Sequence, residues 1–208
     1  MPSKDLYPDL DTLKARYRRW QHYNIRIFDM LSDVTIVSPH GGFIEAGTSH
    51  IAQLVAGRNY NFFDFQGLLK TRPLDLHITS VNFREPLLAE VLGRSRLAVS
   101  IHCMGKEAPG EIWVGGLNKK LRDCMAKALR EKGFTVRTDL PRYKGVHPRN
   151  FVNMPVEHGV QLEIAGDVVD SFFSTPAKFA REVDFAPEAT PVLHNFVAAC
   201  RKALCQCS

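Results

Sequence analysis

The sequence has no long hydrophobic run, which excludes a protein that crosses a membrane by an apolar helix. No apolar stretch approaches the roughly 20 residues that such a helix needs. The first nine residues, MPSKDLYPD, lack the apolar core of a signal peptide. We therefore expect a cytoplasmic protein with no membrane partner, a location that is compatible with release on cell lysis.

Cysteines are few, and their pattern is not that of a disulfide framework or a structural zinc site. There are five of them, an odd number, and no secretion signal accompanies them. Cys205 and Cys207 are separated by one residue near the end of the chain, and no matching pair occurs elsewhere. We expect no disulfide framework and no zinc ribbon, and we assign no function to the tail at 200–208.

Positive charge is only mildly in excess, and the sequence contains no long basic run and no nucleic-acid-binding motif. The formal net charge is +5. This excess serves solubility, or it attracts a polyanion, because a positive field raises the rate of encounter with negative partners. Without a docking motif we do not expect nucleic acid as that partner. An anionic polymer or peptide substrate fits equally well, and the sequence carries no signal for an oligomeric state.

What the sequence does contain is an alternation of apolar runs with amphipathic segments. We expect strands near 34–37, 59–65, 74–81, 97–102, 112–114, 134–138 and 159–165. We expect helices near 12–22, 48–56, 85–92, 118–132 and 191–204. This alternation predicts an α/β protein of three layers, α/β/α, with a mixed, mostly parallel sheet. At 208 residues the chain suits a single domain over 1–208.

Polar side chains follow two of the expected strands at the points where the strands end. His40 and Glu45 come after the strand at 34–37, and His102 ends the strand at 97–102. In open α/β sheets, ligands bind beyond the carboxyl ends of the strands, so these three residues would meet if their strands are neighbours. Two histidines and one glutamate leave a zinc ion with an open position for water or substrate.

Two further polar residues lie inside expected strands. Glu163 lies between Leu162 and Ile164, and a carboxylate buried there needs a partner or a function. It would form an ion pair with an arginine, or act as a general base toward a zinc-coordinated water. His77, in the expected strand at 74–81, is either a core residue or lines the pocket just outside the set of metal ligands.

Five blocks of sequence occur in an order that carries a family resemblance over roughly residues 25–170. They are PHGGxIExGTS from Pro39, DLHITS from Asp75, SIH from Ser100, VGG from Val114 and GVQLE from Gly159. In these blocks the chain resembles the zinc-dependent poly-γ-glutamate hydrolases of phages and their relatives, proteins often described as phage-related replication proteins.

The resemblance implies a fold similar to that of the zinc carboxypeptidases, with one Zn²⁺ at the edge of the sheet. It implies His40, Glu45 and His102 as the zinc ligands and Glu163 as the general base. The reaction implied is hydrolysis of γ-glutamyl amide bonds by a water that zinc activates. We prefer cleavage within the polymer, and cleavage from its ends stays open.

A poly-γ-glutamate substrate carries a free carboxylate on every unit, and the planar fork of arginine binds both oxygens of a carboxylate. We expect the substrate to be bound by Arg84, Arg142, Arg149, Asn150 and Asn153. Tyr143 is a candidate contact for the oxyanion or the leaving group.

Two other functions stay open at this point. The same site would serve an amidase or peptidase that acts on another amide, such as a peptidoglycan stem peptide. A nucleic-acid-binding, replication-associated protein is the alternative from outside the enzymes. It would bind DNA in a salt-dependent way that survives removal of the metal.

Overall fold

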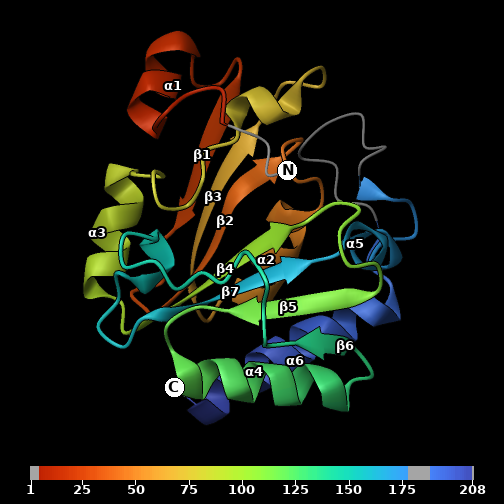
Figure 1. Ribbon diagram of the computed structural model, residues 1–208. Coiled ribbons are helices and arrows are strands. Elements are labelled where there is room, and N and C mark those ends of the chain that lie inside the picture. Colours follow the sequence, from red (N-terminus) through yellow and green to blue (C-terminus); the bar gives the residue numbers. More distant parts are fainter. Residues whose placement is uncertain (1–4, 178–187, 208) are drawn as a thin grey trace.

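A seven-stranded sheet runs through the computed structural model, which describes residues 5–177 and 188–207 (Figure 1). The order of the strands across the sheet is β1-β3-β2-β4-β7-β5-β6. The strands are β1 (Tyr23–Phe28), β2 (Val34–Gly42), β3 (Asn61–Gly67), β4 (Leu97–Cys103), β5 (Glu111–Gly115), β6 (Thr135–Arg137) and β7 (Gly159–Ile164). Two of the six pairings, β1 with β3 and β5 with β7, are antiparallel, and the others are parallel. The expected mixed, mostly parallel sheet is confirmed.

Helices cover both faces of this sheet, so the predicted three layers are confirmed. The α-helices are α1 (Leu10–Arg16), α2 (Thr48–Ala56), α3 (Pro86–Arg94), α4 (Lys119–Glu131), α5 (Gly166–Ser171) and α6 (Pro191–Cys207), and the short 3₁₀ helices are η1 (Pro73–Leu76) and η2 (Phe151–Asn153). Buried side chains of α2, α4, α5 and α6 share one apolar core with the sheet. Those of α1, α3, η1 and η2 form a second core on the other face. Figure 1 shows α1 and α3 well apart from the pair α4 and α6. Among the described residues, no helix combines the length and the apolar character that spanning a membrane requires.

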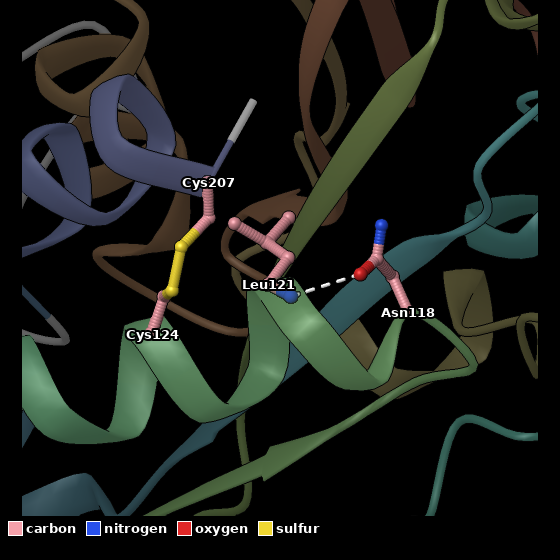
Figure 2. Close-up of a disulfide and its surroundings, with 4 residues drawn as sticks. All are labelled: Asn118, Leu121, Cys124 and Cys207. Atoms are coloured by element: carbon pink, nitrogen blue, oxygen red, sulfur yellow. Dashed lines mark hydrogen bonds between the residues drawn. A yellow bond between two sulfur atoms is a disulfide. The ribbon is translucent and has the colours of Figure 1, made fainter.

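The central strands and the best-defined helix follow from their sequences. The first eight residues of β2 are all buried, as expected for a continuous run in a strand that is covered on both faces. Helix α4 begins after Asn118, whose side chain accepts a hydrogen bond from the N–H of Leu121 at 2.8 Å (Figure 2). Gly133, with a φ of +85°, follows the last turn of this helix.

The C-terminal helix corrects our expectation about disulfides. Cys124 of α4 is bonded to Cys207, the last residue of α6, with 6.6 Å between their Cα atoms (Figure 2). Cys200 and Cys205 are free, as is Cys103 in β4. The odd count was a poor guide here because it does not exclude a single bridge. Residues 83 positions apart in sequence are brought together only by the packing of two helices.

Two expected elements differ in the structure. The helix expected at 12–22 is shorter, ending at Arg16, and the edge strand β1 was missed. The expected strand at 74–81 is instead η1 followed by an irregular segment. Pro73 explains this difference, because proline fixes its own φ in the range that suits the first turn of a helix.

Candidate metal centre

The turn at the end of β2 places His40 and Glu45 side by side. The pairing of β2 with β3 shifts register between Ser38 and Gly41, and irregularities of this kind re-aim side chains at strand ends. Gly42 has a φ of +65°, a conformation that favours glycine. The N–H of Glu45 then donates to the carbonyl oxygen of His40 at 2.9 Å. A tight turn thus returns the chain from His40 to Glu45.

The buried carboxylate of Asp64 supports this turn through the hydroxyl of Ser49. A Cβ atom on Gly41 would collide with the carboxylate of Asp64 and the hydroxyl of Ser49. The Ser49 hydroxyl donates to Asp64 at 2.9 Å and accepts from the N–H of Gly42 at 2.9 Å. Arg26 pairs with the other oxygen of Asp64 at 2.8 Å, so the buried charge is compensated. Sequence analysis gave no sign of this support.

His40 contacts the carboxylate of Glu45 with one ring nitrogen and a backbone carbonyl with the other. Nδ1 of His40 lies 2.8 Å from Oε1 of Glu45, and Nε2 of the same ring lies 2.9 Å from the carbonyl oxygen of Ile78. Because a carbonyl only accepts, Nε2 carries a hydrogen, and in the neutral ring Nδ1 presents a lone pair to the carboxylate. Two acceptors at this distance require a proton or a metal cation between them.

His102 approaches the same carboxylate from the neighbouring strand β4. Its Nδ1 lies 3.8 Å from Oε2 of Glu45, which also accepts the N–H of Cys103 at 2.8 Å. Nε2 of His102 is buried and has no hydrogen-bond partner among the described residues. The structure therefore brings together His40, Glu45 and His102, as the strand order requires.

His77 reaches the cluster from the irregular segment after η1. Its ring centre is 4.0 Å from that of His40, and its Nε2 lies 3.9 Å from Oε1 of Glu45. Its Nδ1 donates to Oδ1 of Asp5 at 2.7 Å. His77 is thus neither in a strand nor in the core, and it lines the cavity beside the other two histidines.

Burial and mutual attraction shift the pKa values of this cluster. Burial alone would raise the pKa of Glu45, but the three neighbouring histidines outweigh it and lower that pKa to about 2. Burial lowers the pKa of His102 to about 3, although Glu45 opposes this shift. For His40 the attraction of Glu45 prevails over burial, and its pKa is raised. Glu45 thus stays ionised and His102 stays neutral at neutral pH, as metal binding requires.

These residues fit a zinc ion by the kind and spacing of their atoms. One ligand atom each from His40, Glu45 and His77 lie within 4.8 Å of one another, and His102 faces the second oxygen of the same carboxylate. Imidazole nitrogen and carboxylate oxygen are ordinary zinc ligands. Two of the rings are also oriented by an acceptor on their other nitrogen, as zinc-binding histidines usually are.

Glu163 lies next to the cluster, opposite His102 in the pairing of β4 with β7. Only 6% of it is exposed, and its Oε1 accepts from the amide of Gln161 at 2.7 Å. The amide of Asn150 in turn donates to the oxygen of Gln161 at 2.8 Å.

No arginine forms an ion pair with Glu163 among the described residues. Burial and the charge of Glu45 raise the pKa of Glu163 well above its ordinary value, against the opposing effect of Gln161. Such a shift is common in general bases.

A cavity of about 1260 Å³ opens over these groups. Its lining includes the three histidines of the cluster together with Glu45 and Glu163. Of the residues that we expected to bind substrate or an oxyanion, three belong to the lining: Arg142, Tyr143 and Asn150. Lys106 adds a second cationic side chain that sequence analysis missed.

The remaining expected substrate ligands lie elsewhere. Arg84 and Arg149 are exposed and do not line this cavity. Asn153 is buried, and its amide donates to the carbonyl oxygens of Gly145 and His147 at 2.7 and 3.1 Å. It thereby holds the loop that carries part of the cavity wall. The roles of these three residues in substrate binding stay predictions.

Gln161 and Asp5 were missed for different reasons. Gln161 is two positions before Glu163 and so faces the same side of β7, a signal that period-two alternation could have supplied. Asp5 contacts a residue 72 positions away. Nothing in its own neighbourhood marks it.

Fold and site together define a three-layer α/β protein with a histidine and glutamate cluster at the carboxyl end of its central strands. The family model of poly-gamma-glutamate hydrolase matches residues 7–199. The chain belongs to the poly-gamma-glutamate hydrolase family, and the resemblance seen in the sequence is confirmed.

Relatives of known sequence come from Bacillus subtilis (strain 168). The chain is 31% identical to the SPbeta prophage-derived protein YoqZ over 174 residues, which are 82% of this chain and 62% of YoqZ. It is 33% identical to YmaC over 68% of this chain and 61% of YmaC. It is 30% identical to YndL over 94% of this chain and 79% of YndL. The chain therefore spans less than two thirds of the length of YoqZ and of YmaC.

Two solved structures are similar along nearly the whole chain. A bacteriophage poly-gamma-glutamate hydrolase superposes with a TM-score of 0.91 at 29% identity, covering 98% of both chains. A zinc-free structure of YndL superposes with a TM-score of 0.86 at 26% identity, covering 97% of this chain and 98% of YndL.

Proposed function

We propose that this chain is a zinc-dependent hydrolase that cleaves γ-glutamyl amide bonds of poly-γ-glutamate. The family supports the substrate, and one observation supports the chemistry above all others. Glu163, a buried glutamate that pairs with no cation among the described residues, lies beside a cluster of histidines built around a second carboxylate. We propose His40, Glu45 and His102 as the zinc ligands, with His77 beside them.

When bound there, a zinc ion supplies a Lewis acid and lowers the pKa of water toward about 7. Glu163 removes a proton from the attacking water and delivers it to the nitrogen of the leaving amine. Its position suits this task because the Gln161 amide holds one carboxylate oxygen, which leaves the other free for the water. Burial raises the pKa of this carboxyl group, which favours its taking up a proton.

The substrate is held, in this proposal, by the cationic side chains of the cavity. Arg142 pairs with Glu107 at 2.6 Å, and the hydroxyl of Tyr143 donates to the same carboxylate at 3.3 Å. A carboxylate of the polymer would take the place of Glu107 on these donors. The cavity is larger than the roughly 300–1000 Å³ that a small ligand needs, and it is open, so it suits a polymer.

Zinc content and polymer length test the proposal together. We expect the wild type to bind one equivalent of zinc and to shorten purified poly-γ-glutamate. His40→Ala and His102→Ala should lose both properties, whereas His194→Ala, outside the cavity, should keep them. Full zinc retention in the two site variants would contradict the ligand assignment. A zinc-loaded wild type that leaves the polymer intact but cleaves another amide would favour the amidase.

A further inference from the structure

The N-terminal part of the chain reaches into the metal cluster through one carboxylate. Oδ1 of Asp5 accepts the Nδ1 hydrogen of His77 at 2.7 Å, and Oδ2 accepts the N–H of Thr79 at 2.8 Å. The carboxylate is thus shared between the two ends of the short segment 77–79. Both the His77 and the Asp5 side chains are mostly buried, at 20% and 11% exposed.

Within the part of the chain that the structure describes, segment 77–79 belongs to no helix or strand, and local backbone hydrogen bonds to Leu74 and Asn82 join only its two ends to their neighbours. It follows η1 and belongs to no strand. A segment outside the sheet must be positioned by other contacts if it is to hold a functional group at a fixed distance. Asp5 supplies two such contacts from one side chain.

The segment bears on the metal cluster in two ways. The carbonyl oxygen of Ile78, between the two residues that Asp5 holds, accepts from Nε2 of His40 at 2.9 Å. This contact determines that Nδ1 of His40 is the nitrogen that faces Glu45. The hydrogen bond from His77 to Asp5 likewise leaves Nε2 of His77 facing Glu45, at 3.9 Å.

We propose that Asp5 is a positioning residue of the metal centre. By holding segment 77–79 it fixes the ring orientation of His40 through Ile78, and it fixes the tautomer of His77 directly. The inference rests on the proposed function in so far as His40 is taken as a zinc ligand. Partners that orient metal-binding histidines typically change metal affinity by about 10–100-fold when they are removed.

Two substitutions in the full-length chain separate the contacts. Asp5→Ala removes both acceptors. Asp5→Asn keeps an oxygen for the N–H of Thr79 but presents an N–H group to His77, which must then carry its hydrogen on Nε2, toward Glu45. A matched control is Asp9→Ala. Asp9 is also an N-terminal aspartate that accepts a backbone N–H, but its side chain caps α1 through Thr12 instead of holding segment 77–79.

Zinc affinity, measured by competition with a chromogenic chelator, is the first measurement. We expect Asp5→Ala to weaken zinc binding about 10–100-fold, Asp5→Asn to weaken it as well, and Asp9→Ala to leave it unchanged. Wild-type affinity in both Asp5 variants would overturn the proposal. An equal loss in Asp9→Ala would also overturn it, because the effect would then be one of N-terminal stability.

The second measurement needs no metal. Long-range ¹H–¹⁵N correlation spectra of the metal-free protein report which ring nitrogen of His77 carries the hydrogen. We expect Nδ1 in the wild type and Nε2 in Asp5→Asn, and the same tautomer in both would refute the direct contact.

If the wild type shows the expected tautomer but binds no zinc, the proposed function fails while the contact stands. If zinc binding and polymer cleavage are normal in every Asp5 variant, only this inference fails.

Discussion

The metal cluster lies at the carboxyl ends of β2 and β4, and we call this end of the sheet, with His40, Glu45, His102 and Glu163, the sheet edge. It and the helical layer of α4 and α6 are both buried, but they differ in what they bury. At the sheet edge, His40, His102 and Glu163 are enclosed with 2–6% exposure, and the side chain of Glu45 beside them is 12% exposed. One ring nitrogen there has no partner among the described residues, and a histidine nitrogen faces a carboxylate oxygen. In the helical layer the enclosed groups are apolar, with Phe134, Phe172 and Phe196 in mutual ring contact.

This difference separates stability from function within one molecule. Enclosed polar groups without full hydrogen bonding cost free energy, whereas enclosed apolar surface stabilises the fold. We infer that the apolar burial in the helical layer offsets the free-energy cost of the buried polar groups at the sheet edge. Changes in the helical layer should then alter stability without altering chemistry, and changes at the sheet edge should do the reverse.

The largest expected effect is on chemistry at the sheet edge. Glu163→Gln removes the general base while it preserves shape, and we expect kcat to fall by about 10²–10⁴-fold. Zinc stoichiometry should be unchanged, because Glu163 is not among the proposed ligands. The control is Glu131→Gln, the same substitution on α4, where an exposed glutamate pairs with Lys202. Normal turnover of poly-γ-glutamate by Glu163→Gln would refute the assigned role.

In the helical layer, the largest expected effect is on stability. Phe196 of α6 is fully buried, and Phe196→Ala should lower the free energy of unfolding by about 3–5 kcal/mol. Urea denaturation of the metal-free protein measures this loss. Val192→Ala, at a half-exposed position of the same helix, is the control and should have little effect. Zinc affinity reduced as much as stability in the Phe196 variant would show that the two regions are not separable.

The bridge between α4 and α6 is a second test of the helical layer. Cys124→Ser should lower the free energy of unfolding by about 2–4 kcal/mol, since the bridge closes a long loop in the unfolded chain. The control is Cys205→Ser, which changes an exposed, free cysteine two residues before the bridged one. Unfolding in the presence and absence of a reductant should reproduce the same difference in the wild type. Equal stability of both variants would show that the bridge does not contribute.

Contacts that follow from the ends of parallel strands could be predicted from the sequence, whereas contacts between residues far apart in the chain could not. The meeting of His40, Glu45 and His102 could be predicted, because the carboxyl ends of parallel strands share one edge. The edge strand β1 was missed although its sequence, YNIRIF, contains alternating polar and apolar residues, because it directly follows the basic segment that we expected to be one helix. The contact of Asp5 with His77 and the bridge from Cys124 to Cys207 could not be predicted. Each joins residues more than 70 positions apart, and no local pattern announces either.

The smallest expected effect concerns the pH dependence of stability in the metal-free protein. Because the folded-state pKa of Glu163 is raised above its ordinary value of 4.5, folding takes up a proton in the window between these two values. The stabilising contribution is fully present below about pH 4.5 and is lost as the pH rises through the folded-state pKa. The wild type should therefore lose stability relative to Glu163→Gln, by up to about 1.4 kcal/mol per pH unit in this window. Urea denaturation of both proteins across this range measures the difference, which reports Glu163 together with its electrostatic coupling to Glu45. A difference that stays constant with pH would mean that Glu163 titrates normally, and the sheet edge would then bear less cost than we infer.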